Sequence, residues 1–321
     1  MKVLITGCCG FIGFSFSQYL LNKNKKIKIV GVDSLNNYYS TILKKDRLTI
    51  LKKQKKRFKF LKKNLKNKYK LRKIFLDNNF DQVFHFAAQA GVRFSFNKPY
   101  NYLDSNILSY LNLLELCKEH KVKKLFFSSS SSVYGDTKKL PVKENAITKE
   151  KNLYAVTKVF NEKISEIYSE KYNMQIIGLR FFTVYGEWGR PDMFIMKYIN
   201  ASIKKKLFYL YNYGKHKRDF TYIEDVLKIL SKISKKRFKK KYYIFNICSS
   251  KPIKLDKIIT EINKNFIAPK IILKKRDFAD VLNTHGSNKK ILSKIGKFNF
   301  TKINVGINNL CKWYKKYYFY N

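Results

Sequence analysis

Two short segments contain the residue types that could move a proton to or from an alcohol. Five serines run from Ser128 to Ser132, and Tyr154 stands four residues before Lys158. On a helix, residues four apart project from one face, so the phenol and the ammonium would lie side by side. A phenol has a reference pKa of about 10, which a nearby ammonium lowers, and a serine hydroxyl can hydrogen-bond the reacting oxygen. The spacing indicates proton removal from an alcohol, which requires a hydride acceptor.

The N-terminal segment predicts a binding site for such an acceptor. A short apolar strand is followed by Gly7, Gly10 and Gly13, which open a predicted helix, and a second strand ends at Asp33. In a dinucleotide-binding turn, Gly7 makes the tight bend, Gly10 lets the backbone approach a pyrophosphate, and Gly13 permits close helix packing. Asp33 would accept hydrogen bonds from ribose hydroxyls and repel a 2′-phosphate, so NAD is predicted over NADP. The alternative is a surface turn in another α/β protein.

Length and composition limit the possible classes of protein. A chain of 321 residues with 45% hydrophobic content can bury one large core, or one domain and a smaller lobe. The sequence has no apolar run long enough to span a membrane and enters a strand at once, so we expect a cytoplasmic protein without a signal peptide. The five cysteines show no metal spacing. We therefore expect reduced thiols and no metal site.

The net charge of +46 would ordinarily indicate a nucleic acid or an anionic surface as partner. Only nine of the 68 basic residues are Arg, however, and alanine occurs only eight times. Residues with AT-rich codons are common throughout, which indicates nucleotide bias in the genome. The lysine runs then read as solvated faces and loops, and no nucleic-acid partner is predicted.

The remaining pattern is one of alternating strands and helices, which predicts an α/β fold with a doubly wound parallel sheet. The serine run then falls at the carboxyl end of a strand, where such sheets bind ligands. Beyond residue 182 the pattern loosens, as expected for a smaller C-terminal α/β lobe. The predicted strands are 2–6, 27–32, 57–61, 82–87, 124–128 and 175–181, and the predicted helices include 65–78, 100–120 and 153–172. The inner stripe of the helix over 100–120 is predicted to be Leu103, Ile107, Leu111 and Leu114.

Six longer strings give a more specific signal than the glycine turn. They are GCCGFIG (7–13), AAQAGVR (87–93), SSSSSVYG (128–135), YAVTK (154–158), LRFFTVYGEWGRPDM (179–193) and RDFTYIED (218–225). With these motifs the chain resembles, nearly end to end, the extended short-chain dehydrogenases/reductases with a Rossmann fold, and among them the UDP-glucuronate 4-epimerases. The resemblance implies an NAD-binding Rossmann domain over 1–181 and about 218–249. It also implies a sugar-nucleotide-binding lobe over about 182–217 and 250–321.

The resemblance implies a role for each catalytic residue. Tyr154 would take the C4 hydroxyl proton while hydride leaves C4 for NAD, and the resulting 4-keto sugar would receive the hydride on its other face. Lys158 would lower the pKa of the phenol and hold the nicotinamide ribose, and Ser130 would be the catalytic hydroxyl. The implied cofactor contacts are Gly7, Gly10, Phe11, Ile12, Gly13, Asp33, Asn64, Leu65, Ala87, Ala88, Tyr154 and Lys158. Relatives usually have an acidic residue, which contacts the adenine, where this chain has Asn64. We therefore expect this difference to affect the affinity for NAD more than the identity of the cofactor.

The substrate contacts are also implied by the resemblance. Thr183 and Arg190 would bind the C6 carboxylate, with hydrogen bonds added by Ser131 and Ser132. Arg218 and Arg276 would clamp the diphosphate. The full set is Arg93, Ser130, Ser131, Ser132, Thr183, Arg190, Arg218 and Arg276.

Ser131 and Ser132 also bear on the type of reaction. Related dehydratases resemble one another in having Asp-Glu at these positions, and related decarboxylases have Glu in the same segment. Two serines offer no carboxyl group for dehydration, which favours epimerisation. The alternatives are a 4-epimerase of UDP-glucose or UDP-N-acetylglucosamine, and a basic nucleic-acid-binding protein on a decayed enzyme scaffold.

Several neighbouring residues are predicted to have structural roles. Ser128 and Ser129 would end a strand and bond backbone, Tyr134 would pack or line the substrate site, and Arg180 would form an ion pair. His85 would lie in or beside the sheet. Relatives are commonly dimers, so a homodimer is a further expectation.

Overall fold

The computed structural model describes residues 1–278 and 280–319. The chain divides into two compact units, Met1–Gly135 with Ala146–Arg180 and Lys235–Phe245, and Asp136–Asn145 with Phe181–Ser234 and Asn246–Asn321. Residues 218–234, which we predicted to belong with the NAD-binding segment, group with the second unit. The assignment of cofactor to one part and of substrate to the other stays a prediction.

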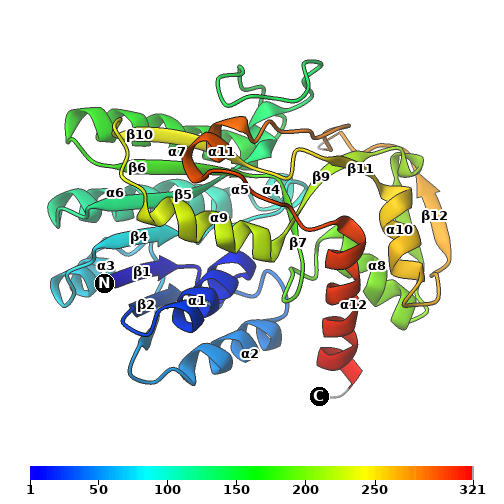
Figure 1. Cartoon of the computed structure of the whole chain (residues 1–321), viewed down its shortest axis with the longest axis horizontal. Helices are drawn as coiled ribbons and strands as arrows, with labels where there is room; N and C mark the ends of the chain where they lie inside the picture. Colours follow the sequence, from blue (N-terminus) through cyan, green and yellow to red (C-terminus); the bar gives the residue numbers. More distant parts are fainter. Residues whose placement is uncertain (279, 320–321) are drawn as a thin grey trace. The chain divides into compact units, whose positions relative to one another are not determined.

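The first unit is built on a seven-stranded parallel sheet in the order β10-β6-β5-β4-β1-β2-β3 (Figure 1). The strands are β1 (Lys2–Thr6), β2 (Lys28–Asp33), β3 (Phe58–Lys62), β4 (Gln82–His85), β5 (Lys124–Ser130), β6 (Ile176–Phe181) and β10 (Tyr242–Ile247). Strand order reverses between β1 and β4, which are parallel neighbours. In open α/β sheets, ligands bind beyond the carboxyl ends of the strands at such a switch point.

Both faces of the sheet are covered by helices, which confirms the doubly wound fold. On one face, Leu4 and Val83 belong to a buried cluster that includes side chains from α3 (Lys68–Leu76) and α6 (Ser109–Glu119). On the other face, Phe84 packs edge-on against Phe16 of α1 (Phe11–Lys23), with ring centroids 4.8 Å apart. The remaining longer helices of this unit are α1 (Phe11–Lys23), α2 (Thr41–Lys52) and α7 (Leu153–Lys171), with short turns at α4 (Phe94–Asn97) and η2 (Ser131–Tyr134).

The single helix predicted over residues 100–120 is interrupted. It consists of α5 (Pro99–Tyr102), a π-helical turn η1 (Leu103–Leu108) and α6. The predicted inner stripe was wrong at its start, because Leu103 is 42% exposed while Asn106 is fully buried. A π turn adds a residue per turn and rotates the buried face, so an even 3.6-residue period no longer applies.

The second unit contains two small sheets. One has the order β11-β9-β7, and the other pairs β12 with β8 in parallel. These strands are β7 (Thr183–Tyr185), β8 (Phe208–Tyr211), β9 (Lys217–Tyr222), β11 (Pro252–Lys254) and β12 (Ile271–Lys274). The helices are α8 (Phe194–Ile203), α9 (Ile223–Lys235), α10 (Leu255–Asn263), α11 (Lys289–Ile295) and α12 (Ile303–Phe319), with a 3-10 turn η3 (Asn212–Gly214). Within the described ranges, no helix has the length and apolar character needed to cross a membrane.

Candidate active site

The structure places the three predicted catalytic residues in the first unit, on two elements that pack together. Ser130 is the last residue of β5, and Tyr154 and Lys158 lie on the first turns of α7, which contacts β5 and η2. The start of α7 is defined by Asn152, whose side chain accepts the Ala155 N–H at 2.9 Å. The ammonium of Lys158 lies 5.6 Å from the centre of the Tyr154 ring. The phenol and the ammonium therefore adjoin, as their spacing predicted.

Lys158 is deeply buried, with an exposed fraction of 1%. Its Nζ donates a hydrogen bond to the main-chain oxygen of Ser128 at 2.9 Å. Burial lowers the pKa of Lys158 to about 8, and the charge of Glu162 opposes that shift. A lysine with this pKa is mostly cationic near neutrality and loses its charge in mildly alkaline solution.

The serine run forms a local hydrogen-bonded turn. The Oγ of Ser130 accepts the N–H of Ser132 at 3.1 Å and lies 3.1 Å from the Oγ of Ser132. Ser131 and Ser132 begin η2 and are half-buried. The hydroxyls of Ser130 and Ser132 therefore lie together at the carboxyl end of β5, and residues 130–132 include no carboxylate.

The glycine turn has the shape that a dinucleotide requires. Gly7 has a φ of +69°, and a Cβ there would lie 2.6 Å from the Ala87 nitrogen. A Cβ on Gly13 would lie 2.1 Å from the oxygen of Gly7, so only glycine permits this close turn. Gly10 is the N-cap of α1 and makes no side-chain cap, and the first turn carries no acidic residue. The N–H groups of this helix start thus suit a phosphate, and the turn fits the pyrophosphate of NAD.

Asp33 at the end of β2 anchors the same turn. One carboxylate oxygen accepts the Cys9 N–H at 3.0 Å and the other accepts the Leu35 N–H at 2.8 Å. Each oxygen has a second lone pair for a ribose hydroxyl. Cys8, Cys9 and Asp33 present donor atoms within 4.8 Å of one another, but burial raises the pKa of the Cys8 thiol well above its ordinary value. The Cys8 thiol is therefore protonated at neutral pH.

The other predicted cofactor contacts differ in exposure. Ala87 and Ala88 follow β4 and are half-buried, and the Ala87 N–H donates to Thr6 Oγ1 at 3.3 Å. Asn64 is exposed after β3 and accepts the Lys66 N–H, whereas Leu65 is buried in the core. Phe11 and Ile12 form the first turn of α1. Contact of these residues with NAD stays a prediction.

Four of the predicted substrate residues lie in the second unit. Arg218 donates to the carbonyls of Val281 and Leu282 at 2.5 and 2.7 Å, and burial lowers its pKa to about 10. Arg276 lies 3.5 Å from a carboxylate oxygen of Asp136, whose other oxygen accepts the Leu282 N–H. The two arginines proposed for the diphosphate are therefore both connected to Leu282, Arg218 directly and Arg276 through Asp136.

Arg190 and Thr183, the two residues proposed to bind the substrate carboxylate, have different surroundings. Arg190 forms a side-on pair with Asp192, with Nε at 3.0 Å and Nη2 at 2.5 Å from the two carboxylate oxygens. Thr183 begins β7 and is half-buried. Arg93 lies in the first unit, at the N-terminus of α4.

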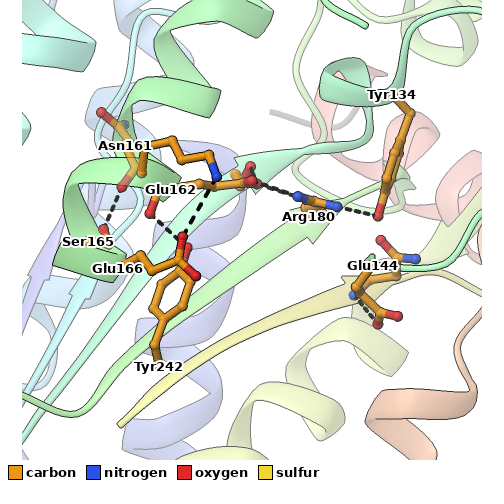
Figure 2. Close-up of polar contacts among 11 residues, drawn as sticks. Tyr134, Glu144, Asn161, Glu162, Ser165, Glu166, Arg180 and Tyr242 are labelled. Carbon is orange, nitrogen blue, oxygen red and sulfur yellow. Dashed lines mark hydrogen bonds and ion pairs between the residues drawn. The ribbon is translucent and has the colours of Figure 1, made fainter. Parts of the chain in front are cut away.

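Two residues near the catalytic group were not predicted. Asn106, in the π turn, holds Gln89 through two hydrogen bonds and donates to Thr157 Oγ1 at 3.0 Å. Glu162 forms a buried ion pair with Arg180, which confirms the structural role predicted for Arg180 (Figure 2). Our expectation for Ser129 was wrong, because its hydroxyl donates to the Glu162 carboxylate and not to backbone.

His85 lies on β4, as predicted, and is unsuited to acid–base catalysis. Its Nδ1 lies 2.8 Å from Thr6 Oγ1. Burial, together with the charge of Lys158, lowers its pKa to about 3. The ring is therefore neutral throughout the physiological range.

Comparisons with known proteins agree with this geometry. The model of the NAD dependent epimerase/dehydratase family matches residues 3–248. UDP-glucuronate 4-epimerase 4 of Arabidopsis thaliana is 34% identical, over 99% of this chain and 76% of that protein. The structure of UDP-glucuronic acid 4-epimerase from Bacillus cereus, in complex with UDP-glucuronic acid and NAD, has a TM-score of 0.92 and 29% identity, over 99% of this chain and 100% of that one.

A second solved structure has a different sugar in its name. UDP-N-acetylglucosamine 4-epimerase from Methanobrevibacter ruminantium M1 has a TM-score of 0.87 and 25% identity, over 98% of both chains. The family match, the glycine turn with Asp33, and the Ser130, Tyr154 and Lys158 group all agree. The chain belongs to the NAD-dependent epimerase/dehydratase family, in its branch of UDP-sugar 4-epimerases, and NAD is its cofactor.

Proposed function

We propose that this enzyme interconverts UDP-glucuronate and UDP-galacturonate by epimerisation at C4 of the sugar. The proposal is supported chiefly by the serine turn, where Ser130 is followed by two hydroxyls and no carboxylate. A carboxylate there would favour dehydration or decarboxylation after oxidation. The names of the similar UDP-glucuronate 4-epimerases support the uronate as substrate.

In this mechanism, Tyr154 as the phenolate takes the C4 hydroxyl proton, while Ser130 hydrogen-bonds the same oxygen. The glycine turn and Asp33 would hold NAD, which would supply the acceptor of the C4 hydride and then its donor to the other face of the keto sugar. Tyr154 then gives its proton back to the C4 oxygen, so the reaction has no net oxidation and no net proton change. Lys158 stabilises the phenolate by charge.

The 4-keto uronate is a β-keto acid, which can lose CO2. The enzyme must therefore hold the carboxylate where cleavage of its C–C bond is stereoelectronically disfavoured. We assign this restraint to Thr183, Arg190, Ser131 and Ser132. The guanidinium of Arg190 already binds one carboxylate side-on, that of Asp192, so its planar fork presents the geometry that a uronate needs.

The same Asp192 pair is the observation that favours a second candidate function. If Asp192 holds Arg190 permanently, the fork cannot bind substrate, and a neutral UDP-glucose or UDP-N-acetylglucosamine would be epimerised instead. The test is incubation of the purified protein with each UDP-sugar separately, followed by chromatographic separation of the epimers. A product from UDP-glucuronate alone supports the first candidate, and a product from the neutral sugars alone supports the second.

A homodimer and a cytoplasmic location remain further proposals. Large apolar side chains are exposed on one stretch of α7, at Val156, Phe160 and Ile167, and on η1, at Leu103 and Leu108. All five cysteines are free and buried, as suits a reducing compartment. Light scattering on the eluting protein tests the dimer, and a mass of one chain contradicts it.

Nucleic acid is not proposed as a partner, and salt-sensitive DNA binding without turnover would contradict this view.

A further inference from the structure

Glu162 occupies a buried position one helical turn beyond Lys158. Its carboxylate receives Arg180 side-on, with Nε 2.8 Å from Oε1 and Nη2 2.6 Å from Oε2 (Figure 2). The hydroxyl of Ser129 donates to the same Oε1 at 2.5 Å. The side chains of Glu162 and Arg180 are only 7% and 6% exposed. Both charges are thus removed from water and hydrogen-bonded on several sides, as a buried pair requires.

The contacts of this pair reach both sides of the catalytic serine. Ser129 precedes Ser130 on β5. After the serines comes Tyr134, whose hydroxyl accepts from Arg180 Nη1 at 2.7 Å and whose ring lies 4.7 Å from the guanidinium carbon. The Glu162–Arg180 pair therefore fixes the residue before Ser130 and the turn after it to one helix and one strand, α7 and β6.

The pair also matters for the charge on Lys158. The ionisable groups that interact with Lys158 are Glu162 and Tyr154 on α7 and His85 on β4, and Arg180 on β6 pairs with Glu162. His85 is neutral and Arg180 is cationic. The hydrogen bond to the Ser128 oxygen supplies a dipole but no charge. Glu162 is therefore the carboxylate that favours the cationic form of Lys158.

We propose that Glu162 is a positioning residue for proton transfer, which orders the serine turn through Ser129 and Arg180 and keeps the buried Lys158 cationic. This inference rests on the proposed roles of Ser130, Tyr154 and Lys158. It predicts two separable effects, one on geometry and one on the pH at which activity is lost.

The charge effect is tested by Glu162→Gln, which keeps the size of the side chain and removes its charge. The rate of epimerisation is measured from about pH 6 to about pH 10 in the NAD-bound enzyme. A nearby opposite charge typically shifts a pKa by about 1–3 units. In Glu162→Gln, the alkaline limb of the pH–rate profile, where activity falls as pH rises, should therefore move to lower pH by about one unit or more. Glu166→Gln is the matched control, because Glu166 pairs with Lys163 at 3.8 Å on the exposed part of the same helix. Glu166→Gln should leave the alkaline limb of the pH–rate profile at the pH of the parent.

A role confined to fold stability predicts a different result. Glu162→Gln would then lower the melting temperature and leave the alkaline limb where it is in the parent, which overturns the proposal. If the single variant does not fold, Glu162→Gln with Arg180→Met removes both charges together, a change that buried pairs often tolerate. Its limb should also lie below that of the parent, and an unchanged limb again overturns the proposal.

The positional effect is tested by Ser129→Ala, which leaves every charge in place. It should lower kcat about tenfold with little change in KM and no shift of the alkaline limb. Tyr242→Phe is the control, because its hydroxyl donates to the main-chain oxygen of Glu162, at 2.8 Å. Ser129→Ala with a parental kcat would contradict the ordering role.

A readout without turnover separates this inference from the choice of substrate. Tyrosinate absorbance is titrated in each protein and in its Tyr154→Phe derivative, and the difference gives the ionisation of Tyr154. The midpoint should rise in Glu162→Gln, because a neutral Lys158 no longer stabilises the phenolate. If no UDP-sugar turns over, the proposed function fails while this midpoint still decides the role of Glu162. An unshifted midpoint overturns it.

Discussion

Replacement of Lys158 by methionine tests the proton-transfer chemistry most sharply. The lysine is buried, and methionine has a similar length without charge, so no unpaired buried ion results. At pH 7 a phenol of pKa about 10 is ionised to about one part in a thousand. A neighbouring cation lowers such a pKa by about 1–3 units. Lys158→Met should therefore lose about 10- to 1000-fold in rate at pH 7, or about 1.4–4 kcal/mol in the barrier.

The pH dependence of the variant gives the stricter test. Without the lysine, Tyr154 ionises near its ordinary pKa, and the rate should rise about tenfold per pH unit from pH 7 to pH 9. The parent should instead decline above about pH 8. The assay is the initial rate of epimerisation at each pH, with retained NAD measured on the denatured protein. Lys163→Met, on the exposed face of the same helix, is the control. A Lys158→Met enzyme within threefold of the parent, with the same pH profile, would refute the reasoning.

Three further predictions concern the cofactor turn, pH and the substrate carboxylate. Gly13→Ala should abolish NAD retention, because its Cβ would lie 2.1 Å from the Gly7 oxygen, and NAD counted in the purified variant checks this; parental NAD content would contradict the fit. In the parent, activity should decline above about pH 8, because a lysine with its pKa lowered to about 8 loses its proton as pH rises through that value; a flat profile to pH 10 would show that the charge is not needed. Arg190→Ala should raise the share of a decarboxylated, UDP-xylose-type product from UDP-glucuronate, measured by mass spectrometry, and no increase over the parent would count against the restraint.

Local sequence patterns were sufficient for the elements whose residues act near one another in the chain. One local unit accounts for Gly7, Gly13 and Asp33. It is a strand, a tight turn and a helix, followed by a second strand. Tyr154 and Lys158 are one turn apart, so helical spacing alone places them together. The prediction of NAD as cofactor and of a neighbouring phenol and ammonium is confirmed, and contact of Gly7, Gly13 and Asp33 with NAD stays a prediction.

Features that depend on three-dimensional packing were not visible in the sequence. The π turn changed the buried face from Leu103 to Asn106, because no residue type announces an extra residue in a helical turn. Glu162 stands four residues after Lys158, a spacing that was available as a signal. Its partner Arg180 lies on another strand, and only folding shows that the pair holds Ser129.

The function proposed for this chain is epimerisation of UDP-glucuronate at C4 without loss of carbon or net redox change. The most direct measurement is incubation of the purified, NAD-containing enzyme with UDP-glucuronate, with products resolved by chromatography and mass. We expect a second species of unchanged mass, UDP-galacturonate, formed without added NAD and in equilibrium with the substrate from either side. A product lighter by CO2 or water, or epimerisation of UDP-glucose but not of UDP-glucuronate, would contradict it.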